Sequence, residues 1–482
     1  MGIPYYFYYL TTKYNNIIIN NLPSNIYIYA IDFNGIIHPE AAKETNEDQL
    51  IINLWNKIIQ YDELYKPSKL LICIDGVAPL AKIIQQRKRR YLTFYKNLID
   101  KTQSKWDTNA ISPGTEFMTK LNIYIKNQNK YIFSGSDEAG EGEHKIFELI
   151  KDEPDDNPII INGLDADLII LSLISGKNNI YLMRENRQQI TYVNIDNLKQ
   201  AIINELQSKW CIENTTDLIE SYCVMCSILG NDFIPHILNL NIKTGGLDKL
   251  INITEIAIRS NGSLVENGKI SQATLTEIFN KISENEDTEI ISYINTDIQR
   301  HPRDFTLKSQ EYAIKNKDPV LFDMYNNSKK WRYYYYKRLF NININNDSAY
   351  ISNASNNYIK GIYWTYNYYK KMELDYTWYY PYNYPPTTKD ISNYLKVNII
   401  NPIKLKGTFL EPKYQLLLIL PIFSIKLIDK SLQKYMTDIT MGLKHLYPTE
   451  YQIQTLFKTH LWECCPILPM IDIEKIIKIN NN

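Results

Sequence analysis

The sequence has few cysteines, no net charge and no long apolar run, and each absence excludes a class of protein. Six cysteines in 482 residues are too few for a disulfide framework. Cys223 and Cys226 have C-x-x-C spacing but lie in an apolar stretch, so we interpret them as buried thiols and not as half of a zinc site. The longest apolar run, residues 416–423, is interrupted by Pro421 and is far shorter than the ~20 residues of a membrane span.

The charge balance and the N-terminal sequence exclude further classes of protein. Lys and Arg number 53, as do Asp and Glu, which excludes binding through bulk positive charge but leaves room for a local basic groove. The start, MGIPYYFYYL, lacks the basic region of a signal peptide, and Tyr6 replaces the Ser or Thr of a myristoylation signal. We therefore expect a soluble protein without membrane contact, located in the cytoplasm, with the nucleus as the alternative.

The chain contains 39 Tyr but only 14 Phe. Tyr, Asn and Ile share AT-rich codons, so a biased genome accounts for much of this enrichment. A large DNA virus and an AT-biased eukaryote both fit. The enrichment by itself therefore carries no functional prediction.

The first half repeats one pattern, a short apolar run that ends at an acidic residue or glycine. Such runs cover residues 26–31, 70–74, 131–133 and 158–161, and helical-period stretches such as 50–60 and 82–98 separate them. Strands that alternate with helices predict an α/β fold with a mostly parallel central sheet flanked by helices. In such sheets the ligand crevice lies at the carboxyl ends of the strands.

Composition divides the chain into three parts. Residues 1–240 carry the strand–helix pattern and are predicted to form an α/β region. Residues 241–330 are polar and rich in Asn, Ser and Glu, and we interpret them as a connector or insertion. Residues 331–482 contain WRYYYYKRLF, GIYWTYNYYK and TWYYPYNYPP, which predict an aromatic-rich, mostly helical second region that packs on the first.

Seven carboxylates follow or lie within segments that should be largely buried. Any one of them could instead cap a helix, but seven at equivalent positions are harder to explain in that way. Like charges brought together would raise one another's pKa, and divalent cations with oxygen ligands would relieve them. Two such ions about 4 Å apart can stabilise the attacking and leaving oxygens of a phosphodiester displacement. The predicted catalytic and metal-binding residues are Asp32, Asp75, Glu141, Glu143, Asp165, Asp167 and Asp232.

A basic helix face follows the second of these acids. Pro79 can begin a helix on which four residues fall at i, i+4, i+7 and i+8 and so share one face: Lys82, Gln86, Arg89 and Arg90. A solvated basic face is the simpler explanation. Because Arg is a planar donor suited to phosphate, the sharper hypothesis is a pocket for a terminal phosphate beside the metal ions.

These motifs together resemble the XRN family of 5′→3′ exoribonucleases, within the wider group that includes flap endonucleases. The segments that carry the resemblance are MGIPYYF, AIDFNGIIH, IDGVAPLAKIIQQRKRRY, WDTNAISPGTEFM, FSGSDEAGEGEHKIF, GLDADLIIL and LGNDFIPH, with weaker ones in the second half. The family's metal-binding acids match all seven carboxylates, and its 5′-phosphate pocket matches the four residues of the basic face. The resemblance also implies a PIN/flap-nuclease-like fold in which residues 1–240 form the catalytic nuclease region and residues 331–482 complete the active-site channel. It further implies a base-stacking pair, His38 and Trp378, with Trp364 as the weaker candidate for the second member.

The resemblance further implies a processive enzyme that degrades single-stranded RNA with a 5′-monophosphate to nucleoside 5′-monophosphates. It would use two divalent metal ions, Mg²⁺ or Mn²⁺. We expect a monomer, and RNA-decay or decapping partners remain open. Two alternatives remain, a structure-specific flap or DNA 5′ nuclease and a catalytically silent scaffold that binds RNA ends. The aromatic second region favours the RNA enzyme, and the seven intact acids disfavour the scaffold.

Overall fold

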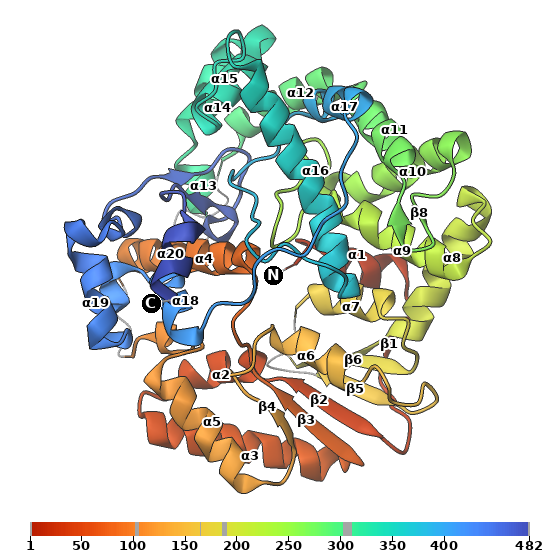
Figure 1. Cartoon of the computed structure of the whole chain (residues 1–482). Coiled ribbons are helices and arrows are strands. Elements are labelled where there is room, and N and C mark those ends of the chain that lie inside the picture. Colours follow the sequence, from red (N-terminus) through yellow and green to blue (C-terminus); the bar gives the residue numbers. More distant parts are fainter. Residues whose placement is uncertain (1, 102–105, 164, 186–189, 302–310, 481–482) are drawn as a thin grey trace.

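The computed structural model describes residues 2–101, 106–163, 165–185, 190–301 and 311–480 (Figure 1). Its central feature is a seven-stranded sheet of order β1-β7-β6-β5-β2-β3-β4. The middle strands, β6, β5, β2, β3 and β4, run parallel, and β7 and β1 add an antiparallel edge. The strands are β1 (Ile18–Ile19), β2 (Ile28–Asp32), β3 (Lys69–Cys73), β4 (Ile132–Ser134), β5 (Ile159–Asn162), β6 (Ile180–Glu185) and β7 (Ile190–Asn194). The predicted α/β fold with a mostly parallel sheet is confirmed.

Helices cover both faces of this sheet because successive strand residues point to opposite sides. Ile28 and Ala30 belong to one core, which they share with α6 (Gly142–Leu149), α7 (Asp167–Ile174), α8 (Ile195–Trp210) and α9 (Thr215–Ser227). Tyr29 and Ile31 belong to the other core, with α2 (Asn34–Ala41), α3 (Glu47–Tyr65) and α5 (Glu116–Gln128). Burial on two faces explains why the strands are continuous apolar runs.

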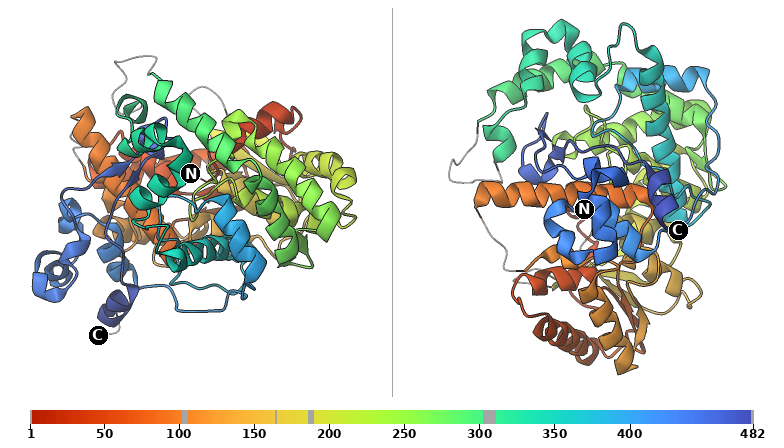
Figure 2. Two further views of the ribbon diagram at one scale, coloured as in Figure 1. Left: turned by 90° about the horizontal axis from the view of Figure 1, so that it is seen from above. Right: turned by 60° about the vertical axis from the view of Figure 1, so that its left-hand side comes forward.

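The long helix α4 (Leu80–Asp100) begins directly after Pro79, as the sequence predicts. In Figure 1 and in the right-hand view of Figure 2, it crosses the molecule between the sheet and the upper helices. Its apolar residues, including Leu80 and Ile83, share a core with α18 (Pro412–Ile419), α19 (Lys430–Thr437) and α20 (Ile473–Asn480). The C-terminal part of the chain thus fixes the helix that carries the basic face.

The middle of the chain is more regular than its polar composition suggests. It contains α10 (Gly246–Asn261), the hairpin of β8 (Val265–Glu266) and β9 (Lys269–Ile270), α11 (Gln272–Ser283), α12 (Glu286–Gln299), α13 (Tyr312–Lys315) and α14 (Pro319–Asn326). Leu247, Leu250, Ile251 and Ile258 of α10 are buried in the core that α8 and α9 share. These helices are amphipathic. Their polar faces account for most of the residues, and a narrow apolar stripe on each helix packs into the core. The boundaries at residues 240 and 330 stay predictions.

The aromatic-rich region is mostly helical and packs on the nuclease region, as predicted. It begins with α15 (Trp331–Leu339), α16 (Ser348–Lys370) and α17 (Thr388–Val397), and after α18 and α19 it contains the short pair β10 (Ile453–Gln454) and β11 (Cys465–Pro466) before ending with α20. Helix α16 lies against α7 and α9. Opposite it, α1 (Tyr6–Lys13) buries Tyr6 and Leu10 in the same core. Throughout the part of the chain that the structure describes, every helix is too short or too polar to cross a membrane.

Candidate active site

The carboxyl ends of the central strands place three of the predicted acids at one edge of the sheet. Asp32 is the last residue of β2 and pairs with Cys73, the last residue of β3. Asp75 follows that strand by two residues, and Asp165 follows β5 by three. Because these strands are parallel and in register, their following residues leave the sheet on the same side.

The start of helix α6 approaches this edge closely. Gly142 donates its backbone N–H to Asp75 Oδ1 at 2.7 Å. A Cβ atom at Gly142 would lie 3.0 Å from Asp32 Oδ1 and 3.1 Å from the carbonyl oxygen of Cys73. A side chain at this position would be crowded, so glycine favours the close approach, which brings the neighbouring residues of α6 to the acids.

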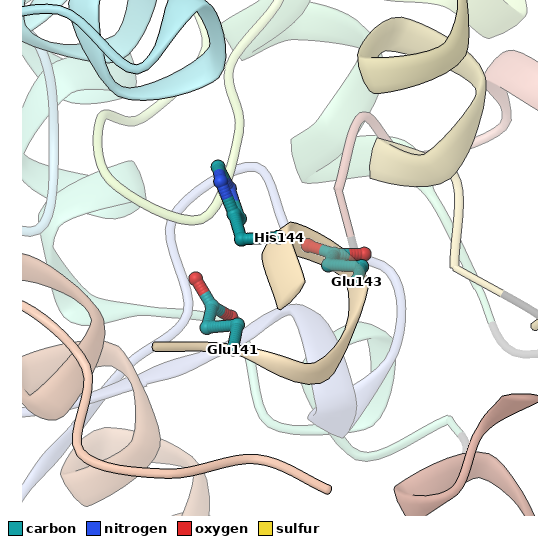
Figure 3. Close-up of side chains that lie close together, drawn as sticks. All are labelled: Glu141, Glu143 and His144. Carbon is teal, nitrogen blue, oxygen red and sulfur yellow. The ribbon is translucent and has the colours of Figure 1, made fainter. Parts of the chain in front are cut away.

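Glu141 and Glu143 flank that glycine and are both buried. Together with His144 they form a group whose ligand atoms all lie within 4.8 Å of one another (Figure 3). Burial is the main cause that lowers the pKa of His144 to about 3, so its imidazole is neutral at neutral pH. The start of α6 thus presents two carboxylates and a neutral imidazole in one place.

The acids act on one another electrostatically. Burial first, and then the charges of Asp75, Asp165 and Glu141, raise the pKa of Asp32 well above its ordinary value. Burial likewise raises the pKa of Glu143 and of Asp167, and neighbouring acids add to both shifts. The structure therefore brings all seven predicted carboxylates into one network, although their role as metal ligands stays a prediction.

The residues present fit divalent cations. The donors are oxygens of one charge sign, which is the ligand set that Mg²⁺ and Mn²⁺ prefer. Asp167 Oδ1 is buried and has no hydrogen-bond partner among the described residues. An orphaned, buried carboxylate oxygen is costly unless something positive faces it, and a metal ion would satisfy this requirement.

Lys82 of the basic face lies inside the acidic network. Its ammonium pairs with Glu141 and, at 2.9 Å, with Asp232. Burial by itself would lower the pKa of Lys82, but Asp232 and Glu141 outweigh it, so that pKa is raised well above its ordinary value. Burial would raise the pKa of Asp232, yet Lys82 holds that pKa well below its usual range. One cation thus links α4 to the acids.

The other three residues of the predicted face differ in their exposure. Gln86 is buried and Arg89 is exposed. Arg90 donates to Ser112 Oγ at 2.7 Å, and burial, followed by the charge of Arg89, lowers the pKa of Arg90 to about 9. His38 lies in the field of the same two arginines, since burial first and then Arg89 lower its pKa to about 4, with Arg90 adding to the effect. Arg89, Arg90 and His38 therefore gather near Asp75.

The structure places both candidate tryptophans in the core. Trp364 donates its indole N–H to the carbonyl oxygen of Asp375 at 2.8 Å, as expected for a packing residue. Trp378 is 5% exposed and lies against Trp364, with ring centroids 5.2 Å apart. A Cβ atom on Gly361 would come within 2.9 Å of the Trp378 ring. Stacking of Trp378 on a base stays a prediction, and this packing does not favour it.

Three residues at the site, Tyr368, Asn34 and His144, were not identified from the sequence. Tyr368 of α16 donates its hydroxyl to Glu141 Oε1 at 2.5 Å and packs on His144, with ring centroids 4.1 Å apart. Asn34 accepts the backbone N–H of Asp75 through Oδ1 at 3.0 Å. The segment GEGEHK contains His144 and could have pointed to it. No sequence signal distinguishes Tyr368 among 39 tyrosines.

Comparison with known families gives two matches. Residues 1–186 match the model described as XRN 5′-3′ exonuclease N-terminus. Residues 212–330 and 316–481 match the Xrn1 helical domain. Together these models cover nearly the whole chain.

Curated relatives also match nearly the whole of this chain. Human 5′-3′ exoribonuclease 1 is 26% identical, with 99% of this chain and 34% of that protein covered. The fission-yeast (Schizosaccharomyces pombe) 5′-3′ exoribonuclease 1 is 25% identical, and chicken (Gallus gallus) 5′-3′ exoribonuclease 2 is 22% identical; this chain covers 48% and 69% of them, respectively. The chain thus spans from about a third to about two thirds of the length of these relatives.

Among solved structures, the catalytic core of Rad2 in complex with a DNA substrate matches with a TM-score of 0.33 and 12% identity, covering 67% of this chain and 85% of that one. The bacteriophage T5 D15 flap endonuclease with DNA and metal ions matches with a TM-score of 0.30 and 9% identity, covering 63% and 98%. These scores are too low to support a functional comparison.

Proposed function

Because this chain belongs to the XRN family of 5′→3′ exonucleases, we propose that it hydrolyses RNA processively from a 5′-monophosphate end and releases nucleoside 5′-monophosphates. The observation that carries this proposal is the network of seven carboxylates at the carboxyl edge of the sheet, with the basic helix α4 beside it. Buried acids whose pKa values are raised by one another are typical of a metal-dependent phosphodiesterase.

The metal ligands in this proposal are the seven acids. Asp32, Asp75 and Asp165 approach from the sheet edge, Glu141 and Glu143 from α6, Asp167 from α7, and Asp232 from the segment after α9. When bound, two ions, Mg²⁺ or Mn²⁺, would supply an activated water and neutralise charge on the phosphate. The chain orients the ligands: Gly142 N–H fixes Asp75, and the Tyr368 hydroxyl fixes Glu141.

The 5′-terminal phosphate is assigned to Lys82, Gln86, Arg89 and Arg90. Arg89 is exposed and so is free to reach an incoming phosphate, and Arg90 lies next to it with one N–H already donated to Ser112. Lys82 holds Glu141 and Asp232, and its three ammonium protons can also serve a phosphate oxygen. His38 lies beside the two arginines and is the better supported member of the proposed base-stacking pair, His38 and Trp378.

Digestion of RNA of defined ends tests the proposal. A uniformly labelled single-stranded RNA with a 5′-monophosphate should yield mononucleotides in Mg²⁺ and remain intact in EDTA. Capped, triphosphate and 5′-hydroxyl versions should decay slowly or not at all, since a 5′-hydroxyl leaves the arginines without their charged partner. The Asp167→Asn variant, which removes one ligand charge, serves as the matched control. Degradation of a circular RNA, or preference for a flapped DNA, would instead support the endonuclease alternative.

We further propose that the chain acts as a monomer on single-stranded RNA in the cytoplasm or nucleus. Sedimentation of the purified chain with and without a short RNA tests the first point. A sedimenting species that contains more than one copy of the chain, with or without RNA, would contradict it.

A further inference from the structure

A cavity with a volume of about 800 Å³ opens beside the acidic network. Its lining includes Asp165 and Asp232 of the acidic network as well as Trp462. Its walls come from the N-terminal residues Gly2–Phe7, from helix α4, from residues 229–236 and 240–243, and from residues 457–459 and 461–465. The cavity therefore connects the proposed metal site to a part of the surface that no step of the proposed function uses.

The lining of this cavity is basic although the chain has no net charge. Its acids are Asp165 and Asp232, which belong to the acidic network, and Glu463, which accepts the backbone N–H groups of residues 459 and 460 and lies 3.9 Å from the ammonium of Lys243. Its six basic residues are Lys88, Arg89, Lys96, Arg184, Lys243 and Lys458. A groove lined by positive charge attracts a polyanion, and its cations can contact successive phosphates along a nucleic-acid strand.

An exposed aromatic group lies in the same lining. Trp462 is 51% exposed, and it is the only exposed one among the seven tryptophans, all of which the structure describes. The His460 ring stacks on it with planes 10° apart, and the Tyr5 ring lies 6.3 Å away with its plane tilted by 46°. Lys243 Nζ is positioned 3.8 Å from the centre of the Tyr5 ring.

The backbone of Tyr5 indicates that this position is held against a conformational cost. Its φ is +63°, in the left-handed region that a bulky residue rarely adopts. Such conformations persist where the surrounding structure requires them, often at binding sites. Here the conformation begins α1 and places the Tyr5 ring next to Trp462.

We propose that Trp462 and Tyr5 form a stacking platform for bases of the RNA strand that lie outside the metal site. The basic residues that line the cavity would contact the phosphates of the strand between this platform and the metal site. This inference rests on the proposed function for the identity of the strand. Aromatic rings bind every base through its π-face, so the platform suits an enzyme that must hold any sequence while it advances along the strand. It is separate from the pair His38 and Trp378.

Binding of a length series of RNA tests the platform. Oligouridylates of two to twelve nucleotides with a 5′-monophosphate and a 3′ dye are titrated in EDTA, so that nothing is cleaved, and affinity is read from anisotropy. Stacking contributes ~1–3 kcal/mol per base, so Trp462→Ala should weaken binding of the twelve-nucleotide strand about 5- to 150-fold. Binding of the dinucleotide should not change, and Trp462→Tyr should restore most of the loss.

Tyr8→Ala is the matched control, because Tyr8 is 70% exposed in the same N-terminal segment and does not line the cavity. It should bind every length as the wild type does. Equal affinity of Trp462→Ala and wild type for the twelve-nucleotide strand would overturn the platform, and so would a loss that is as large for the dinucleotide. Failure of the proposed function is recognised separately, since a wild-type chain that leaves RNA intact in Mg²⁺ can still show the length-dependent loss.

Discussion

Tyr368→Phe is expected to weaken the affinity for Mg²⁺ without changing the fold. The substitution removes one hydroxyl, which donates to Glu141 Oε1 at 2.5 Å in a buried position. A hydrogen bond to a charged group contributes ~1.5–3 kcal/mol, so the loss corresponds to roughly 10- to 150-fold in an equilibrium constant. The same hydroxyl lowers the pKa of Glu141, which burial raises, so a proton should also compete better with the metal ion in the variant.

The assay is the rate of mononucleotide release from a 5′-monophosphate RNA as a function of Mg²⁺ concentration. The half-saturating concentration should rise by the factor above, and excess Mg²⁺ should restore most of the rate. Tyr366→Phe is the matched control: its hydroxyl also donates to a buried carboxylate from α16, that of Glu220, which lies outside the acidic network. A half-saturating concentration within about twofold of wild type in Tyr368→Phe would refute the reasoning, as would an equal increase in both variants.

Three further outcomes are expected. Asp165→Ala or Asp167→Ala should abolish hydrolysis while RNA binding survives, because each removes a proposed metal ligand; gel-shift and digestion assays check this, and activity within about threefold of wild type would contradict it. Arg89→Ala should erode the preference for 5′-monophosphate over 5′-hydroxyl RNA and leave the Mg²⁺ dependence unchanged, and competition between the two ends measures it. Burial raises the pKa of Glu286 from 4.5 to about 7, so the folded chain keeps a proton that the unfolded chain loses, and the free energy of unfolding falls as pH rises through that window. Glu286→Gln should remove about 3 kcal/mol of that fall, as denaturant titrations at several pH values would record; identical pH dependence in both chains would contradict it.

The sequence predicts the sheet and the acids well because both depend on local patterns. Apolar runs that end at Asp32 and Asp75 indicate buried parallel strands, and parallel strands deliver their following residues to one edge. The start of α4 at Pro79 follows from the fixed φ of proline. These features need no knowledge of distant parts of the chain.

The rest depends on contacts between distant segments, which no local pattern encodes. Lys82 looked like one of four equivalent phosphate ligands, yet its ammonium lies among acids from α6 and from residue 232. Trp378, in a segment full of aromatic residues, packs against Trp364 and not at the surface. Trp462 drew no attention in the sequence, because only the fold brings it to a cavity that Asp165 and Asp232 also line.

The hydrogen bond from Tyr368 to Glu141 joins residues that are 227 positions apart. During synthesis, the strands and all seven acids leave the ribosome before helix α16 does. A partly made chain therefore holds the acids without the hydroxyl that donates to Glu141, and that contact forms only after the later half of the chain has been added.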